Sequence, residues 1–240
     1  MTQTEKRPFA KTHISVDCVV LGFDGERLNA LLVKRSDIKL HDMKLPGSLV
    51  YADETPDQAA ARVLEGYTGL KGLTIMQFHT FGSLERTSNP EDVAWIKRSE
   101  DEDVERIVTV AYFAIIRISR KMKHICRDNE SLTWVPVDSL PRLAFDHNVI
   151  VSVAVEHFAK LACSNNEYFF ELLPKKFTIY QFRKLYELAH MTMVDPGNFH
   201  KKVTQMPYVV PLEEKEVGKK HRSARYYKYN KKIFKKDRLL

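Results

Sequence analysis

The chain has 240 residues, 44% of them hydrophobic, which allows one large domain or two small ones with buried cores. No run of 18 apolar residues occurs and the first residues lack the apolar core of a signal peptide, so we expect a cytoplasmic protein with no membrane span. Three distant cysteines, Cys18, Cys126 and Cys163, favour reduced thiols over a disulfide framework or a zinc site.

The net charge of +7 is unevenly distributed along the chain. Residues 171–240 contain 17 Lys and Arg against 7 Asp and Glu, whereas the preceding 170 residues contain 21 basic against 24 acidic side chains. This pattern indicates that only the C-terminal part meets a polyanion, with a solvated basic surface as the alternative.

The N-terminal half begins with two apolar, β-branched runs separated by DGER, which predict a strand hairpin over 13–35. A helix is expected from Thr55 or Pro56 through Thr68, ending at Gly69, and TIMQFHTFGSL then returns to strand character. The polar, acid-rich stretch 87–105 has the composition of an inserted surface loop.

Two further strands, RIVTVAYFAIIRI and SLTWVPV, precede a segment with apolar residues at helical spacing. Its residues Ile150, Ala154, Phe158 and Leu161 predict a helix that covers the first domain. Strands interleaved with helices indicate an α/β sandwich with a mixed sheet, and we place this first domain at 1–165.

We predict that the stretch CSNNEYFFELLPKK is a linker to a second domain at 166–240. Thr178 and Gln181 form a capping box for the helix FTIYQFRKLYELAH, and a second helix is expected over 196–206.

Two short candidate strands, YVVPLE and ARYYKYN, follow and are joined by a loop rich in Lys, His and Arg. Two helices followed by a basic two-stranded wing give the order of a winged helix-turn-helix domain.

The segment PGSLVYADETPDQAAARVLEGYTGL resembles the Nudix box, G-x5-E-x7-R-E-U-x-E-E-x-G-U, where U is aliphatic. Glu54, Arg62 and Leu64 match the pattern when Gly69 and Leu70 are aligned with its end, and Ser48 stands at its first glycine.

Three glutamate positions of the pattern are occupied by Val63, Gly66 and Tyr67. At spacing i, i+3, i+4 these positions share one helical face, which carries the carboxylates that bind Mg²⁺ in active Nudix enzymes. A hard cation needs several oxygen ligands, so we predict no metal, no cofactor and no hydrolase activity.

The order of motifs along nearly the whole chain resembles the Nudix-related transcriptional regulators, in which a degenerate Nudix domain precedes a winged helix. The segments that carry this resemblance, besides the box, are FGSLER, RIVTVAYFAI, AFDHNVIVSVA, LLPKKFT, GNFHKKV and KKHRSARYYKY. Two departures are the longer acidic insertion after Arg86 and the presence of Gly197 and His200 where arginines are common.

The resemblance implies that the first domain senses a small effector, either ADP-ribose or a related nucleotide or a pentose sugar. The chain is most similar to the arabinose-responsive branch of the family. Four arginines could bind a diphosphate bidentately, and each could instead be an ion-paired structural residue. The candidate ligand-binding residues are Arg35, Glu54, Arg62, Arg86 and Arg106. With the glutamates absent, Arg62 is expected to pair with Glu54 or Glu65.

The second domain is expected to bind a double-stranded DNA operator as a homodimer, because a half-site reader usually binds a two-fold site. The first turns of its second helix and the basic wing would supply the contacts to bases and phosphates. The candidate DNA-binding residues are Asn198, His200, Lys201, Lys202, Lys219, Lys220, His221, Arg222 and Arg225. Phe199 and Val203 are expected in the core.

Two alternatives to a ligand-responsive repressor or activator stay open at this point. One is a Nudix hydrolase acting on ADP-ribose or a related compound, with Glu54 and acids from Asp101 to Glu105; the missing helical carboxylates argue against it. The other is a nucleic-acid-binding module with no ligand, where RNA is disfavoured because no aromatic stacking platform is visible.

Overall fold

The computed structural model describes residues 9–35, 43–129, 131–164, 167–216 and 223–237. The elements of its N-terminal part are β1 (His13–Phe23), β2 (Leu28–Lys34), β3 (Met43–Lys44), β4 (Gly47–Leu49), α1 (Pro56–Thr68), β5 (Met76–Phe81), η1 (Leu84–Thr87), α2 (Pro90–Glu100), β6 (Ile107–Arg117), α3 (Arg120–Asp128), β7 (Leu132–Pro136), η2 (Val137–Ser139) and α4 (His147–Ser164). The C-terminal part contains α5 (Glu167–Leu172), α6 (Ile179–His190), α7 (Pro196–Thr204), β8 (Val209–Lys215), β9 (Arg225–Tyr229) and α8 (Lys231–Asp237).

The N-terminal sheet is mixed, as the sequence predicts. Its strands run in the order β3-β2-β1-β6-β5, with β4 paired to β1 and β7 paired to β2. The long strands β1 and β6 are parallel over their whole length, and the other pairs are antiparallel.

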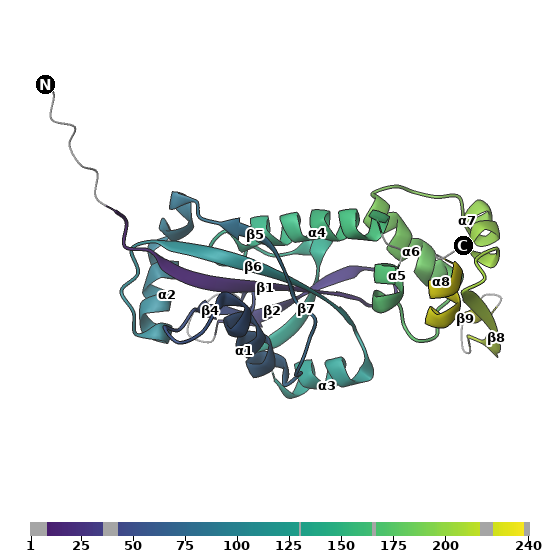
Figure 1. The fold of residues 1–240 in the computed structure, drawn as a ribbon, viewed down its shortest axis with the longest axis horizontal. Coiled ribbons are helices and arrows are strands. Elements are labelled where there is room, and N and C mark those ends of the chain that lie inside the picture. The colour runs from purple at the N-terminus through teal and green to yellow at the C-terminus, as the bar shows by residue number, and fades with distance from the viewer. Residues whose placement is uncertain (1–8, 36–42, 130, 165–166, 217–222, 238–240) are drawn as a thin grey trace, which may run out of the picture.

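Alternation along β1 divides the interior into two layers. Val16, Cys18 and Val20 belong to the core under α1, whereas Leu21 and Phe23 belong to the core under α4. Because successive strand residues point to opposite faces, one apolar strand supplies both cores. Figure 1 shows α1 and α3 on one side of the sheet and α4 on the other, which confirms the predicted α/β/α sandwich. No helix within the described ranges is long and apolar enough to cross a membrane.

The structure contradicts the prediction of a surface loop over 87–105, because α2 lies within it. Asn89 caps this helix by accepting from the Glu91 amide, and Pro90 occupies its first turn. The acidic composition concealed a buried face, since Ile96 and the carboxyl of Asp92 are both buried.

The structure also contradicts the linker assigned to 163–176. Helix α4 continues to Ser164, and α5 follows with Phe169, Phe170 and Leu172 buried. Such a run of large apolar side chains is too costly to leave in water, so it packs instead of spanning a gap. Arg117 at the end of β6 donates to the carbonyl oxygen of Leu173 and, at 2.9 Å, to that of Phe170.

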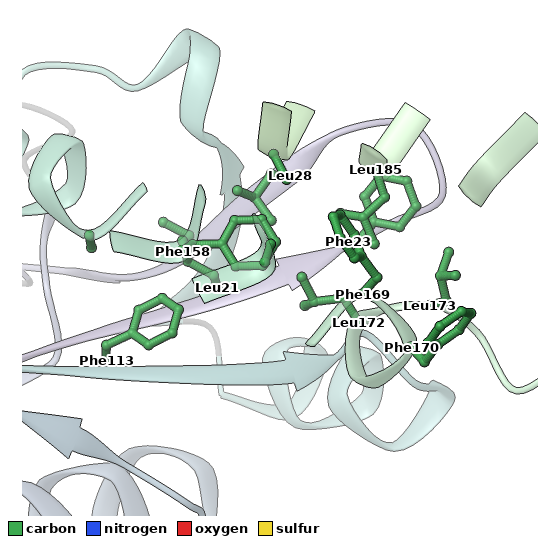
Figure 2. Packing of buried hydrophobic residues seen from close by; sticks show 14 of the residues in the cluster. Leu21, Phe23, Leu28, Phe113, Phe158, Phe169, Phe170, Leu172, Leu173 and Leu185 are labelled. Atoms are coloured by element: carbon green, nitrogen blue, oxygen red, sulfur yellow. The ribbon is translucent and has the colours of Figure 1, made fainter. Parts of the chain in front are cut away.

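The core is therefore continuous from the sheet into the C-terminal part (Figure 2). Phe23 of β1 belongs to the same buried cluster as Phe169 of α5 and Leu185 of α6.

The C-terminal part is a winged helix in which α6 and α7 form the helix-turn-helix and β8 and β9 form the wing. The predicted capping box of Thr178 and Gln181 is confirmed, and α7 begins at Pro196 as expected, although it ends at Thr204. Buried Glu187 fixes the turn by accepting from the Val194 amide at 3.2 Å and from Arg183 at 2.7 Å.

Candidate functional site

The helix α1 is formed as the Nudix box predicts, with Thr55 as N-cap in a capping box and Gly69 in the left-handed conformation at its end. Arg62 binds Glu54 with two hydrogen bonds, of 2.9 Å from Nε and 2.5 Å from Nη2, so of the two expected partners, Glu54 and Glu65, it pairs with Glu54. The hydrogen bonds from Arg62 lower the pKa of Glu54. Glu54 also accepts from the Tyr51 amide at 2.9 Å. Arg62 therefore stabilises the loop before α1 through Glu54.

The face of α1 that would carry catalytic carboxylates offers no set of oxygen ligands. Val63 is buried in the core, Tyr67 packs against the same core, and the position of a Gly66 Cβ is open, with nothing within 4 Å. A divalent cation such as Mg²⁺ requires several oxygens at about 2.0–2.6 Å, so these residues do not fit it. Among the described residues, no group of three or more His, Cys, Asp or Glu is placed to hold a metal ion.

A small cavity lies at the end of the sheet between β1, the β3–β4 segment and α2. Its walls combine a flat aromatic ring, charged side chains and apolar groups. The lining residues are Ser15, Asp17, Lys44, Gly47, Ser48, Leu49, Arg86, Trp95, Ile96, Glu100, Ile107, Phe145 and His147.

One wall of this cavity is a buried charge cluster centred on Arg86. Its guanidinium donates to Asp17 and to Asp146 through separate nitrogens, and its side chain is 3% exposed. His147 Nε2 lies 3.3 Å from the second Asp17 oxygen. Since His147 Nδ1 accepts from the Leu45 amide at 3.0 Å, Nε2 carries the proton that faces Asp17.

The ionised form of Asp17 is strongly favoured in this cluster. Burial acts to raise the pKa of Asp17, but His147 and Arg86 outweigh it and hold the pKa far below its usual range. Asp17 therefore stays ionised at neutral pH, and its bond with Arg86 fixes the shape of this wall.

Other lining residues carry groups that can meet a ligand. Lys44 is 5% exposed, and its Nζ donates to the Gly47 carbonyl at 2.8 Å and lies 4.9 Å from the Trp95 ring centroid. Burial lowers the pKa of Lys44, while the charges of Asp17 and Glu100 oppose that effect. The buried Ser15 hydroxyl has no hydrogen-bond partner among the described protein atoms.

The predicted arginines do not gather around one cavity. Arg86 lines it, but Arg35 is buried and donates to Asp92 at 2.7 Å, and Arg62 is held by Glu54. Arg106, which directly precedes β6, makes a 3.5 Å contact with the Gly82 carbonyl. The structure thus does not assemble the four guanidinium groups into one diphosphate site.

Some cavity residues that the sequence did not identify as site residues had recognisable signals. Asp17 interrupts an otherwise apolar strand, and a charge in a buried strand requires partners. Asp146 and His147 lie within the AFDHNVIVSVA segment but were given no role there. Trp95 had no such signal in the sequence, because the acidic composition of the surrounding segment predicts a loop.

The exposed face of α7 carries the predicted base-reading residues. Asp195 caps the helix by accepting from the Asn198 amide at 2.8 Å, while the side chains of Asn198, His200 and Lys201 are exposed. Lys202 is exposed too, with its Nζ 5.2 Å from the Tyr186 ring centroid. Phe199 and Val203 are buried on the opposite face, as expected.

The described part of the wing is less basic than its sequence suggested. Exposed Arg225 donates to the Leu212 carbonyl at 2.9 Å and pairs with Glu213 at 3.3 Å across the two strands. Glu214 pairs with Lys176 at 2.5 Å. Four predicted DNA-binding residues, Lys219, Lys220, His221 and Arg222, lie outside the described residues.

Comparisons with known proteins agree with this architecture. The NUDIX domain model matches residues 11–153, and the model of the NrtR DNA-binding winged helix domain matches residues 169–229. No curated protein sequence is significantly similar to the chain.

Solved structures share the fold. NrtR of Shewanella oneidensis, in complex with a 27mer DNA, is 23% identical with a TM-score of 0.64, over 90% of this chain and 93% of that one. A MutT/nudix family protein from Enterococcus faecalis is 21% identical with a TM-score of 0.59, over 95% and 90% of the two chains.

The matches place both halves in sequence families as well as in a common fold. The chain belongs to the Nudix family and carries a C-terminal winged helix domain of the NrtR DNA-binding type.

Proposed function

We propose that the protein is a ligand-responsive transcriptional regulator in which residues 1–165 sense a small effector and residues 166–240 bind operator DNA. The observation that carries the proposal is the conjunction of a polar cavity in a Nudix domain without its metal-binding glutamates and an exposed, basic recognition helix. The fold alone does not determine function, which depends on the residues of each site.

The effector that suits the cavity is a pentose sugar such as L-arabinose. Ser15, Lys44, Asp17 and Glu100 offer hydrogen-bonding groups for several hydroxyls, and Trp95 offers a flat apolar face for the ring carbons. A nucleotide such as ADP-ribose would need a diphosphate site, and the arginines expected to form one are mostly engaged elsewhere.

The path from effector to DNA runs through α4. His147 at its first position lines the cavity, and the far end of the helix packs against α6 of the helix-turn-helix. Figure 1 shows α4 extending along the molecule towards α6. At this far end Cys163 Sγ lies 3.1 Å from His190 Nδ1. A rigid helix in contact with both sites is a suitable element to transmit a shift from one to the other.

The partner of the C-terminal part is double-stranded DNA, bound by a homodimer so that two recognition helices meet two half-sites. Asn198 would contact a base edge and Lys201 and Lys202 bases or phosphates. The family model for this domain describes a DNA-binding winged helix, which supports this assignment.

The Nudix domain is proposed to be catalytically inactive. Val63, Gly66 and Tyr67 provide no carboxylates for a metal, and the remaining acid of the box, Glu54, is bound to Arg62. Incubation of the full chain with ADP-ribose and Mg²⁺ or Mn²⁺ should release no product above a buffer control. Multiple turnovers that disappear in Glu54→Gln would overturn this part of the proposal.

The sensing role is tested by isothermal titration calorimetry of the full chain with L-arabinose and, separately, with ADP-ribose. We expect one sugar per chain to bind, and Trp95→Ala to weaken it by about 5- to 30-fold, as for loss of an apolar contact worth about 1–2 kcal/mol. Lys97→Ala, an exposed site on the same helix, is the control and should bind like the wild type. Tight binding of ADP-ribose with no heat from the sugar would reassign the effector.

A further inference from the structure

Lys44 occupies an unusual place for a lysine. Its side chain is buried, and its Nζ lies near two aromatic rings, 4.9 Å from the centroid of Trp95 and 5.9 Å from that of Tyr67. A cation near the faces of aromatic rings is stabilised by their quadrupoles, more strongly when water is excluded. The charges of Asp17 and Glu100 add to that stabilisation.

The position of Lys44 is informative because of what Tyr67 replaces. Tyr67 stands at the last glutamate of the Nudix box, and the carbonyl that accepts from Lys44 belongs to Gly47, adjacent to the first position of the box. The ammonium is therefore close to both ends of the motif that holds a divalent cation in a Nudix enzyme. This positive charge belongs to a side chain of the protein, so it needs no set of carboxylates to bind it.

Burial of Lys44 requires such compensation. Removing an ammonium from water costs several kcal/mol unless it is paired and hydrogen-bonded. One of the three N–H groups donates to Gly47, its hydrogen-bond partner within the described residues, and the group lines the cavity with donors left for a ligand.

We infer that the Lys44 ammonium takes the place of the divalent cation of a Nudix hydrolase, so that the cavity binds its ligand through a chain-borne positive charge and without a metal. The ligand part of this inference rests on the proposed function; the metal part does not.

The metal part is tested with Mn²⁺ as the probe, by electron paramagnetic resonance of the free ion mixed with the full chain. Gly66→Glu combined with Tyr67→Glu restores two carboxylates, at one open and one half-buried position of α1. We expect this double variant to bind Mn²⁺ at least about tenfold more tightly when Lys44→Met is added, because a positive charge roughly 6 Å away repels the ion. The wild type should leave the free Mn²⁺ signal unchanged.

Circular dichroism melting establishes that each variant is folded, and Lys44→Gln replaces Lys44→Met if the latter is not. Equal Mn²⁺ affinity with and without the lysine, including no binding in either case, overturns the inference, as does Mn²⁺ binding by the wild type.

The ligand part is tested by calorimetry of the full chain with L-arabinose. Affinity should be the same in EDTA and in Mg²⁺, and Lys44→Met should weaken it by at least about tenfold, with Lys44→Arg recovering part of the loss. A requirement for Mg²⁺ would contradict the inference. Absence of sugar binding by the wild type would instead count against the proposed effector and leave the Mn²⁺ result standing.

Discussion

The charges of the cavity and the charges of α7 are arranged in opposite ways. In the cavity, Arg86 is bound by Asp17 and Asp146, and all three side chains are largely withdrawn from water. On α7, Lys201 and Lys202 are exposed, and its described first turn contains no acidic side chain. The charges of the first arrangement are paired within the protein, and those of the second are left for an external partner.

This difference separates what each region recognises. A buried cluster whose charges are paired within the protein offers oriented hydrogen bonds, which suits an uncharged polyol. An unbalanced exposed row produces a long-range field, which suits a polyanion and makes binding depend on salt. The total charge of the chain does not reveal this division; the partners of each residue do.

The largest expected effect comes from breaking the cavity cluster. Arg86→Met removes the counter-charge of two acids in a buried site and should lower the free energy of unfolding by about 3–5 kcal/mol. Urea denaturation at pH 7 measures this. Lys201→Met, an exposed change of the same kind on α7, should stay within about 0.5 kcal/mol of the wild type.

The pH dependence of stability distinguishes the charge of Arg86 from its packing. The folded-state pKa of Asp17 lies below its unfolded value, so its contribution to stability is present above the unfolded pKa, about 3.9, and is lost as the pH falls through the folded pKa. The stability gap between wild type and Arg86→Met should therefore narrow as the pH falls below about 4. A gap that stays constant over this range would show that packing, not charge, sets it.

The next effect concerns base reading by α7. Asn198→Ala should cost about 1–3 kcal/mol on the operator and relax preference at one base pair, because a base-edge contact is lost. Fluorescence anisotropy with operator variants measures both quantities. A uniform loss over all base pairs would place Asn198 on the phosphate backbone instead.

A smaller effect is expected from a phosphate contact. Lys201→Ala should weaken operator and scrambled duplex alike and reduce the slope of log affinity against log salt by about one unit. Lys97→Ala, on the exposed side of α2, provides the control and should leave the slope unchanged. The assignment fails if Lys201→Ala affects the operator alone.

The smallest expected effect tests the vacated face of α1. Gly66→Ala should raise stability by about 1 kcal/mol, since the new methyl group meets nothing within 4 Å and alanine favours the helix. Thermal melting checks this, and sugar and DNA affinities should not change. Reduced sugar affinity would indicate that a ligand occupies the space beside Gly66.

The sequence predicted the fold better than the site, for identifiable reasons. Local signals such as the helix start at Thr55 or Pro56, the capping box at Thr178 and the apolar runs of the 13–35 hairpin depend on near neighbours, and all of them held. The same holds for the pairing of Arg62 with Glu54, which lie eight residues apart.

The cavity could not be predicted because its walls are distant in sequence. Arg86 meets Asp17 and Asp146, which are 69 and 60 residues away along the chain. The acidic composition of 87–105 predicts a loop and not α2, so the sequence does not indicate that Trp95 and Glu100 line a site. Polar composition reports the exposed face of such a helix and is silent about the buried one.

The central claim is that occupancy of the cavity changes the affinity of α7 for DNA, and linkage provides its most direct test. The measurement is anisotropy of labelled duplexes from upstream of the protein's own gene and neighbouring sugar genes, with L-arabinose titrated into the full chain. The account predicts a change in operator affinity of at least about fivefold, and none for a scrambled duplex. An unchanged operator affinity, at sugar concentrations that calorimetry shows to be saturating, would contradict it.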